Sequence, residues 1–391
     1  MAQARTFPFS DAAGLLLDPT FAFLRKHELV SRIQLPYGGE GWLLVRYADV
    51  RAVTTDRRFS RAAAVGPQTP RLTVQPPGGS ALTLMDAPGH TRLRKLLSAA
   101  FTARRVAELK PRVEQITREL LADLRSPADL MTSFALPLPV RVICELMGVP
   151  YDDRDHFSRL ATMLLSSTAH SQAEVSQAVD ELSEYLADLI DARRARPSDD
   201  LIGALIQARD AEDQLSEQEL LTMCGTILAA GYENVANAIG NFTLLLLTER
   251  QLFDRLHAEP ELLPDAIEEL LRYVVSGLAV SHPRIATEDV ELGGVLIGKG
   301  EAVFTSMPAA NHDPAVFTDP DLIDLTRTDN KHLAFGYGMH HCIGAALARL
   351  ELQVALGALI AAFPTLKLEP DAVQWKLGFT VRGPSRLLVS W

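Results

Sequence analysis

The segment FGYGMHHCIG, residues 335–344, holds the residue types best suited to chemistry. Cys342 comes just before a helical pattern that begins GAALARL. A helix N-terminus lowers the pKa of a nearby thiol and favours the thiolate. The three glycines Gly336, Gly338 and Gly344 let the backbone approach a flat, bulky group. Together, a thiolate, a helix end and an open backbone suit a soft metal held from one side.

Two other interpretations of this segment exist. A single cysteine such as Cys342 is more often a buried structural thiol than a ligand. The run His340-His341-Cys342 also contains zinc-type ligands. Three adjacent residues do not easily surround a tetrahedral ion, however, and no second ligand cluster occurs at zinc-site spacing. The zinc interpretation is therefore the poorer one.

A second candidate site lies inside a long helical pattern. Ser216 and Glu219 form an S-x-x-E capping box, and the pattern then runs without proline to about Glu249. At 1.5 Å per residue, such a helix is about 50 Å long. Its residues are apolar nearly all round, so we expect one continuous, central and buried helix.

The stretch AAGYENVAN, residues 229–237, interrupts this apolar pattern. A glycine inside a helix, here Gly231, costs about 1 kcal/mol relative to alanine. Buried Glu233 and Asn234 need polar partners, since burial without them is costly. We therefore expect the group Gly231 to Asn234 to lie deep in the protein and to serve a function.

The composition excludes several classes of protein. The chain of 391 residues has a formal net charge of −11, which argues against nucleic-acid binding. Cys144, Cys224 and Cys342 lie far apart and form no CxxC pair, which indicates a reducing compartment. No signal peptide and no stretch near the ~18 apolar residues of a membrane helix is evident. We expect a soluble, cytoplasmic monomer.

The remaining patterns predict a mainly α fold with small β-sheets, in a single domain over residues 1–391. SRIQL and WLLVRY flank PYGGEG and predict a hairpin. The proline-rich piece at 65–81 predicts a long loop. Helical patterns run from about Thr91 to Thr248 and from Gly344 to Phe363, and VELGG and VLIGKGEAVFTS predict short strands.

The motif F-G-x-G-x-H-x-C-x-G resembles the haem-binding loop of the cytochrome P-450 family. Glu269 and Arg272 match the family's E-x-x-R motif, and His90 and Arg94 match its H-x-x-x-R motif. Arg284 matches its second propionate-binding arginine, and the ending RGPSRLLVSW is also similar. The resemblance covers essentially the whole chain. It implies haem b (iron protoporphyrin IX) held between the long central helix and the helix after the cysteine loop.

The resemblance implies a role for each matched residue. Cys342 is the expected thiolate ligand of the haem iron, which favours O–O cleavage. Phe335 packs beside the sulfur, and Gly344 belongs to the same loop. Glu269 and Arg272 form a buried ion pair that supports the fold. The haem carboxylates are held by His90, Arg94, Arg284 and His340. Without Cys342, His90 and Arg94 read as solvated helix surface.

The central helix of the family carries the pattern A/G-G-x-D/E-T, which here is Ala230-Gly231-Tyr232-Glu233-Asn234. Gly231 is expected to leave room for dioxygen, and Glu233 to be the acid of a proton-carrying pair. Asn234 replaces the usual threonine, and an amide separates donor and acceptor atoms that a hydroxyl combines. We hypothesise that a substrate hydroxyl or a water delivers protons, or that the reaction ends in radical coupling. The alternative is that asparagine is a neutral replacement.

The substrate-pocket walls are placed by the same resemblance. Their mainly apolar lining suits a medium-sized, partly aromatic natural-product intermediate of secondary metabolism. Pieces such as GEGWLLV and VICELMGVP resemble actinobacterial relatives, some of which couple polyketide phenols or tryptophan-containing cyclic dipeptides. Core packing is the alternative for each residue. The predicted lining residues are Gln68, Leu84, Met85, Leu165, Ala229, Ser276, Leu278, Val280 and Phe379.

The chain contains no flavin or iron–sulfur motif, so electrons from NAD(P)H are expected through ferredoxin reductase and ferredoxin. Seven basic residues against one acid, Glu108, lie between His90 and Arg112 and predict a docking patch for an acidic partner. A solvated helix face is the alternative. The patch consists of Arg92, Arg94, Lys95, Arg104, Arg105, Lys110 and Arg112.

Two classes of function fit these expectations. One is a haem-thiolate mono-oxygenase or coupling oxidase that uses dioxygen. The other is a haem-binding sensor or carrier without chemistry. Gly231 and Glu233 favour the enzyme, because a carrier needs no path for protons.

Overall fold

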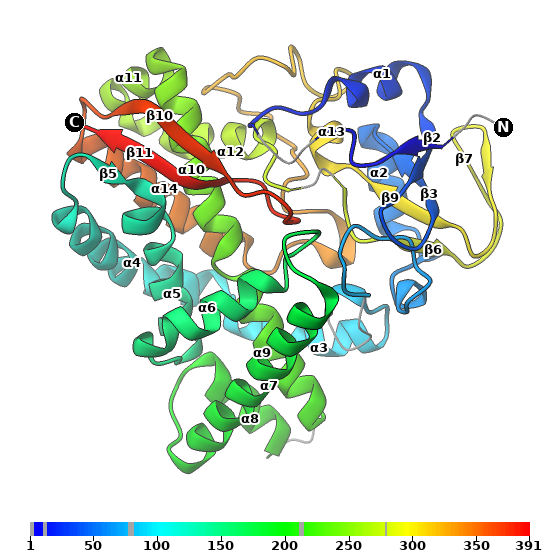
Figure 1. The fold of residues 1–391 in the computed structure, drawn as a ribbon, viewed down its shortest axis with the longest axis horizontal. Coiled ribbons are helices and arrows are strands. Elements are labelled where there is room, and N and C mark those ends of the chain that lie inside the picture. The colour runs from blue at the N-terminus through cyan, green and yellow to red at the C-terminus, as the bar shows by residue number, and fades with distance from the viewer. Residues whose placement is uncertain (1–3, 11–13, 77–81, 211–214, 278–279) are drawn as a thin grey trace.

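The structure is a computed structural model that describes residues 4–10, 14–76, 82–210, 215–277 and 280–391. Figure 1 shows most helices gathered on one side of the molecule, with the largest sheet on the other side beside α1, α2 and α13. The helices are α1 (Pro19–His27), α2 (Tyr47–Thr55), α3 (Gly89–Ala100), α4 (Ala103–Asp123), α5 (Pro137–Met147), α6 (Arg154–Met163), α7 (Gln172–Ala195), α8 (Leu201–Asp210), α9 (Glu217–Ala230), α10 (Glu233–Thr248), α11 (Arg250–Ala258), α12 (Leu263–Tyr273), α13 (Met307–Asn311) and α14 (Ala345–Ala362).

In the described residues, three small sheets accompany the helices, which confirms the mainly α prediction. The six-stranded sheet has the order β1-β2-β3-β9-β6-β4, the second β10-β11-β5, and the third pairs β7 with β8. The strands are β1 (Arg5–Thr6), β2 (Val30–Gln34), β3 (Glu40–Leu44), β4 (Phe59–Ser60), β5 (Ala128–Asp129), β6 (Arg284–Ala286), β7 (Val290–Leu292), β8 (Val295–Ile297), β9 (Ala302–Thr305), β10 (Lys367–Trp375) and β11 (Pro384–Ser390).

The predicted hairpin is confirmed. β2 and β3 pair antiparallel, with Ile33 opposite Gly41. The later short strands are also confirmed, and β7 and β8 pair antiparallel with each other. β9 then pairs parallel with β3, with Trp42 opposite Val303. The sheet thus joins the start of the chain to the segment that leads toward the cysteine loop.

The prediction of one continuous central helix is wrong. The capping box of Ser216 and Glu219 is present, but α9 ends at Ala230 and α10 begins at Glu233. At the break, a Cβ on Gly231 would lie 2.5 Å from Cδ1 of Ile143 in α5. Buried Tyr232 turns toward α6 and donates a hydrogen bond to the Ser158 carbonyl at 2.8 Å. Close packing on α5 and α6 therefore interrupts the helix.

The expectation that no segment is apolar enough to cross a membrane is also wrong in one place. Among the described residues, Ala345–Ala362 (α14) is the one helix whose length and composition would allow it. It packs against α4, α10, α11 and α12. Its apolar character is explained by this position in the helical core.

Candidate functional site

The loop before α14 presents Cys342. The backbone N–H of Cys342 donates to the Phe335 carbonyl at 2.8 Å, which closes the loop. Gly336 and Gly338 have φ angles of 75° and 71°, a region that favours glycine. A Cβ on Gly338 would also lie 2.9 Å from the Thr54 carbonyl oxygen of α2. The two glycines therefore shape the loop and seat it on α2, and the Cys342 side chain is left exposed.

The expected lowering of the thiol pKa is not found. The Cys342 side chain is accessible, yet protein surrounds it on most sides, and this desolvation raises its pKa. The Gly344 N–H and the charges of Arg94 and Arg349 oppose the rise but do not cancel it. Burial thus outweighs the helix end, and a coordinated metal ion is what would deprotonate this thiol.

Three of the predicted carboxylate-binding residues come together with unpaired nitrogen atoms. Nε2 of His90, Nη1 of Arg284 and Nε2 of His340 have no hydrogen-bond partner among the described residues. The His90 and His340 rings lie 4.5 Å apart. Burial, reinforced by neighbouring positive charges, lowers the pKa of His340 to about 2. Buried donors without partners are costly, so this cluster fits an anionic group with several acceptor oxygens.

Arg94, the fourth predicted residue, is placed differently. Its Nη2 donates to the His341 carbonyl at 2.5 Å, so it supports the cysteine loop directly. Its charge also acts on the Cys342 thiol. The structure therefore brings Arg94 to the loop that carries the predicted ligand. Arg94 also lies beside the cluster of unpaired nitrogens, since burial and then the charge of Arg94 lower the pKa of His90.

Arg61 belongs to the cluster but was not predicted. Only 8% of Arg61 is exposed, and its Nη1 donates to the Thr83 carbonyl at 2.8 Å. β4 pairs with β6, with Ser60 opposite Ile285, which places Arg61 next to Arg284. Burial and the charge of Arg284 lower the pKa of Arg61 to about 9. In the sequence, RRFSRAA reads as ordinary surface charge, and only the pairing of distant strands reveals the contact.

The break between α9 and α10 has one open face. Ala230 and Asn234 are exposed, whereas Glu233 and Val235 are buried. Ala230 ends α9 and Asn234 lies in the first turn of α10, so the two exposed residues flank the break. The expectation that the whole group is buried is therefore wrong for Asn234. Within the described residues its side chain has no hydrogen-bond partner, so its amide is available to a ligand or water.

Glu233 points elsewhere and is held by an unpredicted lysine. Its side chain is 2% exposed, and Oε1 lies 2.5 Å from Nζ of Lys376. Lys376 also donates to Oδ1 of Asn237 at 2.9 Å, and Nδ2 of Asn237 lies 3.4 Å from Oε1 of Glu233. Glu233 therefore belongs to a closed polar group on the buried side of α10, while Asn234 lies on the open side.

Three predicted pocket walls converge. Phe379 pairs with Ser166 as an isolated antiparallel bridge, and the Thr380 N–H donates to the Leu165 carbonyl at 2.8 Å. The Arg382 N–H donates to the Ser276 carbonyl at 2.9 Å. The segments of Leu165, Ser276 and Phe379 therefore meet, and their role as walls of a substrate pocket stays a prediction.

The other predicted pocket residues differ in how deeply they are buried. Leu84 is buried, Gln68 is exposed, and Leu278 lies outside the described residues. Partly buried side chains that pack against the apolar core clusters are those of Met85, Ala229 and Val280.

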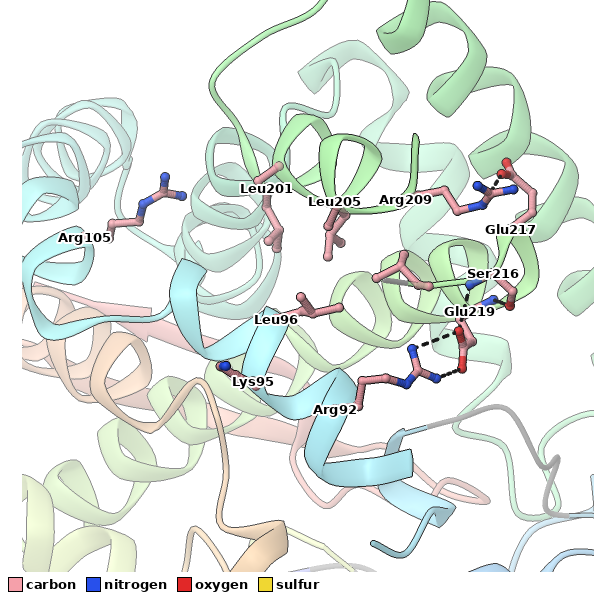
Figure 2. Close-up of a pocket in the computed structure, with 13 residues that line it drawn as sticks. Arg92, Lys95, Leu96, Arg105, Leu201, Leu205, Arg209, Ser216, Glu217 and Glu219 are labelled. Atoms are coloured by element: carbon pink, nitrogen blue, oxygen red, sulfur yellow. Dashed lines mark hydrogen bonds and ion pairs between the residues drawn. The ribbon is translucent and has the colours of Figure 1, made fainter. Parts of the chain in front are cut away.

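One cavity of the described structure lies away from these residues. It measures about 960 Å³ and opens between α3, α8 and α9 (Figure 2). Leu96, Leu201 and Leu205 supply its apolar lining, and Arg92 and Glu219 form an ion pair on its rim. None of the predicted substrate-pocket residues lines it.

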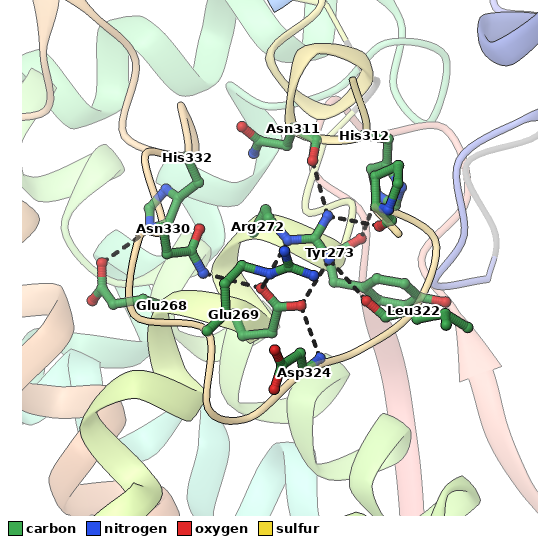
Figure 3. Close-up of polar contacts among 12 residues, drawn as sticks. Glu268, Glu269, Arg272, Tyr273, Asn311, His312, Leu322, Asp324, Asn330 and His332 are labelled. Atoms are coloured by element: carbon green, nitrogen blue, oxygen red, sulfur yellow. Dashed lines mark hydrogen bonds and ion pairs between the residues drawn. The ribbon is translucent and has the colours of Figure 1, made fainter. Parts of the chain in front are cut away.

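The predicted ion pair of α12 is confirmed (Figure 3). Glu269 and Arg272 have fully buried side chains and two contacts of 2.8 Å. Arg272 also donates to the carbonyls of Asn311, Pro320 and Leu322. Glu269 accepts from the Asp324 N–H, Arg327 and Asn330. The pair thus fixes the irregular chain between α13 and the cysteine loop.

The predicted basic patch is partly neutralised by acids from other elements. Arg112 contacts Glu145 of α5, and Arg92 contacts Glu219 of α9. Asp199 lies 3.8 Å from Arg105. The segment is therefore strongly basic in sequence, but in the folded protein acids from other elements reduce the local positive charge. Within α4, Arg104 pairs with Glu108 and Lys110 with Glu114, and the side chains of these two bases are 88% and 58% exposed.

Comparison with known proteins gives the family. In the described part of the chain, no group of three or more His, Cys, Asp and Glu residues could hold a metal ion, which argues against the zinc interpretation. The sequence model of Cytochrome P450 matches residues 150–386. The chain belongs to the cytochrome P450 family. It is therefore a haem-thiolate oxidoreductase, and not a carrier without chemistry.

Relatives of this P450 act in natural-product pathways. The mycinamicin IV hydroxylase/epoxidase of Micromonospora griseorubida is 47% identical and covers 100% of this chain and 99% of its own. The nocardicin C N-oxygenase of Nocardia uniformis subsp. tsuyamanensis is also 47% identical, with the same coverage. The solved structure of a P450 with biaryl coupling reactivity has a TM-score of 0.95 and 41% identity, with both chains fully covered.

The residues present fit the haem group that the family binds. Cys342 offers an accessible sulfur, and the unpaired nitrogens of His90, Arg284 and His340 offer donors for two carboxylates. Arg61 adds a further buried cation beside them. The chain is thus an oxidoreductase of a family that uses haem, dioxygen and an external source of electrons.

Proposed function

We propose that this P450 oxidises a medium-sized, partly aromatic natural-product intermediate and inserts oxygen without the usual threonine. The observation that carries the proposal is the exposed, unpartnered amide of Asn234 on the open face at the start of α10. When bound, the haem would supply an iron centre whose thiolate ligand promotes O–O cleavage. Asn234 donates through Nδ2 and accepts through Oδ1, so it can orient a water or a substrate hydroxyl.

The proton source follows from the position of Glu233. Its carboxylate is paired with Lys376 and Asn237 on the buried side of α10. A proton donor has to lie within hydrogen-bond reach of its acceptor, directly or through one water. We infer that a water or substrate hydroxyl held by Asn234 makes the last transfer, with Glu233 acting through it.

The substrate class is supported by the converging pocket walls. Phe379, Leu165 and Ser276 combine apolar surface with a polar point, which is typical of sites for such ligands. By their names, two relatives act on mycinamicin IV and nocardicin C, and we take a natural-product substrate for this chain from that analogy. A binding assay with compounds of this class tests whether the analogy holds for this chain.

A second candidate is oxidative coupling, which joins two aromatic units with loss of two hydrogens. It is favoured by Asn234 in the threonine position and by the likeness to a P450 with biaryl coupling reactivity. Product masses separate the two reactions. Insertion adds one oxygen to the substrate, whereas coupling gives a dimer that lacks two hydrogens.

Asn234→Thr tests the role of the amide. A threonine hydroxyl donates and accepts through one rotor and restores the usual family pattern. We expect the variant to change the peroxide released per NAD(P)H consumed by about 10-fold, or to change the product, because proton delivery is worth roughly 100-fold or more. Peroxide, product mass and turnover rate are measured together. If all three equal those of the wild type, asparagine is a neutral replacement and the proposal fails.

We further propose that a ferredoxin docks on the patch around Arg104 and Arg105. Complementary charge speeds association, and the effect weakens as salt screens it. Arg104→Glu together with Arg105→Glu should slow reduction by about 10-fold at low salt and less at high salt. A control with the same change in charge is Lys26→Glu with Lys299→Glu, since both lysines are exposed on the sheet side. Equal rates for the two double variants would contradict the proposal.

A further inference from the structure

We propose that the ion pair of Glu268 and Arg349 adjusts the reduction potential of the haem iron from the side of the cysteine loop. Arg349 favours the reduced iron, and Glu268 limits this effect. The inference goes beyond the proposed function, because it concerns how readily the iron takes up an electron and not which compound is oxidised.

Glu268 and Glu269 are neighbours on α12 but contact different parts of the fold. Successive residues of a helix point about 100° apart. Glu269 contacts Arg272, whereas the two carboxylate oxygens of Glu268 accept from Nε and Nη2 of Arg349, both at 2.7 Å. Two parallel contacts of this kind fix the plane of the guanidinium as well as its distance. Glu268 therefore holds Arg349 of α14, the helix that follows the cysteine loop.

The carboxylate of Glu268 also accepts from His332 (Figure 3). Nε2 of His332 lies 3.0 Å from Oε2 of Glu268. Nδ1 of the same ring accepts from the Ala334 N–H at 3.2 Å, so the ring proton is on Nε2 and the imidazole is neutral. Burial raises the pKa of Glu268, but hydrogen bonds from His332 and Arg349 outweigh it and lower the pKa to about 2. At neutral pH the group thus contains one anion and one cation.

The guanidinium of Arg349 reaches the cysteine loop over an aromatic ring. Its Cζ lies 4.5 Å from the ring centre of Phe335, which is within the range of a cation–π contact. The Phe335 carbonyl accepts from the Cys342 N–H at 2.8 Å. The charge of Arg349 also acts on the Cys342 thiol. One cation therefore lies against the residue that closes the loop and acts on the sulfur that would hold the iron.

Partial burial strengthens the effect of these two charges. The side chain of Arg349 is 33% exposed and that of Glu268 is 24% exposed. Salt screens partly buried charges less than exposed ones, and electrostatic energies increase as the effective dielectric constant falls. Reduction of ferric to ferrous iron adds one electron, which the external donor supplies. A nearby cation favours the added electron and a nearby anion opposes it, so the two side chains act with opposite signs.

Arg349→Met and Glu268→Gln test these two signs. The reduction potential is measured by spectroelectrochemical titration of the purified, haem-loaded protein without substrate. Arg349→Met should lower the potential by about 60 mV, the one-electron equivalent of a 10-fold change in the equilibrium constant. Glu268→Gln should raise the potential by about 30 mV, which corresponds to about 3-fold. Arg349→Lys keeps the charge without the planar fork and should retain most of the wild-type potential.

A pair that only supports the fold would give a different result. Loss of the contact between α12 and α14 would lower the stability of both single variants, and it would not move their potentials in opposite directions. Shifts of the same sign in Arg349→Met and Glu268→Gln therefore overturn the inference. The wild-type potential in a folded, haem-loaded Arg349→Met protein also overturns it.

Arg141→Met is the matched control for the loss of charge. Arg141 of α5 pairs with Glu119 of α4 at 3.2 Å, lies 5.1 Å from the ring centre of Tyr151, and is 26% exposed. The substitution removes the same charge and a similar ring contact away from the cysteine loop, so the potential should stay unchanged. Equal shifts in Arg141→Met and Arg349→Met would show an effect of net charge alone and would contradict the inference.

The double variant Glu268→Gln with Arg349→Met keeps the test informative if Arg349→Met does not fold. It removes both charges together, so its potential should lie close to that of the wild type. A fall of about 60 mV in the double variant would mean that the lost contacts, and not the charges, set the potential.

The test is separable from that of the proposed function. The potentials are measured without substrate, and neither Glu268 nor Arg349 belongs to the predicted pocket. If no natural product shifts the Soret band, the proposed substrate class fails. The potentials of the two single variants still decide whether the pair acts on the iron.

Discussion

Replacing Cys342 with serine is expected to abolish the thiolate-type haem spectrum and the oxidative activity. The accessible sulfur of Cys342 follows a loop closed by the hydrogen bond from its own N–H to Phe335. A serine hydroxyl does not supply the electron density of a thiolate. Activity should fall by well over the roughly 100-fold that changes in outer-shell residues cost at metal sites. Haem is still retained in part, because His90, Arg284 and His340 remain to hold its carboxylates.

The matched control is Cys144→Ala. Cys144 is buried in α5, and burial raises the pKa of its thiol to about 12, so it stays protonated. The control should keep the wild-type spectrum. Absorption spectra of the ferrous carbon-monoxide complex compare the two variants. A thiolate-type spectrum in Cys342→Ser would show that another residue binds the iron.

Arg272→Met is expected to cost about 3–5 kcal/mol of the free energy of unfolding, as the loss of one partner in a buried pair typically does. It leaves Glu269 with Arg327 as its one remaining ion-pair partner among the described residues. It also leaves the carbonyls of Asn311 and Leu322 without their donor. Because this region leads into the cysteine loop, haem retention should fall together with stability. Denaturant unfolding and haem content of the purified protein measure both.

Arg255→Met is the control for this change. Arg255 pairs with Glu259 one helical turn away, and both side chains are more than two-fifths exposed. Exposed pairs of this spacing contribute about 0.3–0.5 kcal/mol. If the two variants lose similar amounts of unfolding free energy, burial does not strengthen the pair of Glu269 and Arg272.

Structural features that depend on the local residue pattern were predicted correctly from the sequence. The capping box of Ser216, the hairpin around Gly41 and the helix after Cys342 all depend on neighbours within a few residues, and the structure contains them. The buried E-x-x-R pair, which the family resemblance implied, is also present, and its spacing of three places both side chains on one face of a helix.

What the sequence missed depends on distant contacts. The helix breaks at Gly231 because Ile143 and Ser158, from two other helices, hold the chain there. Arg61 reaches the buried cluster only through the pairing of β4 with β6. Lys376 meets Glu233 across the fold. Local periodicity carries no signal for such contacts.

The charge of the predicted patch shows the same limit. Counting residues between 90 and 112 gave a strongly basic segment, but Glu145 and Glu219 come from other helices. The charge of a surface depends on every element that contributes side chains to it. The pKa of the Cys342 thiol also depends on distant contacts, since burial by the surrounding protein raises a pKa that a helix end alone would lower.

A Soret-band titration of the purified protein tests whether Cys342 holds a haem beside the substrate site. The panel consists of cyclic dipeptides, aromatic polyketides, macrolides and terpenes. We expect a thiolate-type haem spectrum that shifts to high spin with a medium-sized, partly aromatic class, and this shift would place the substrate beside the haem held by Cys342. A well-folded protein that binds no haem, or a haem spectrum without thiolate character, would contradict the assignment of Cys342 as the iron ligand.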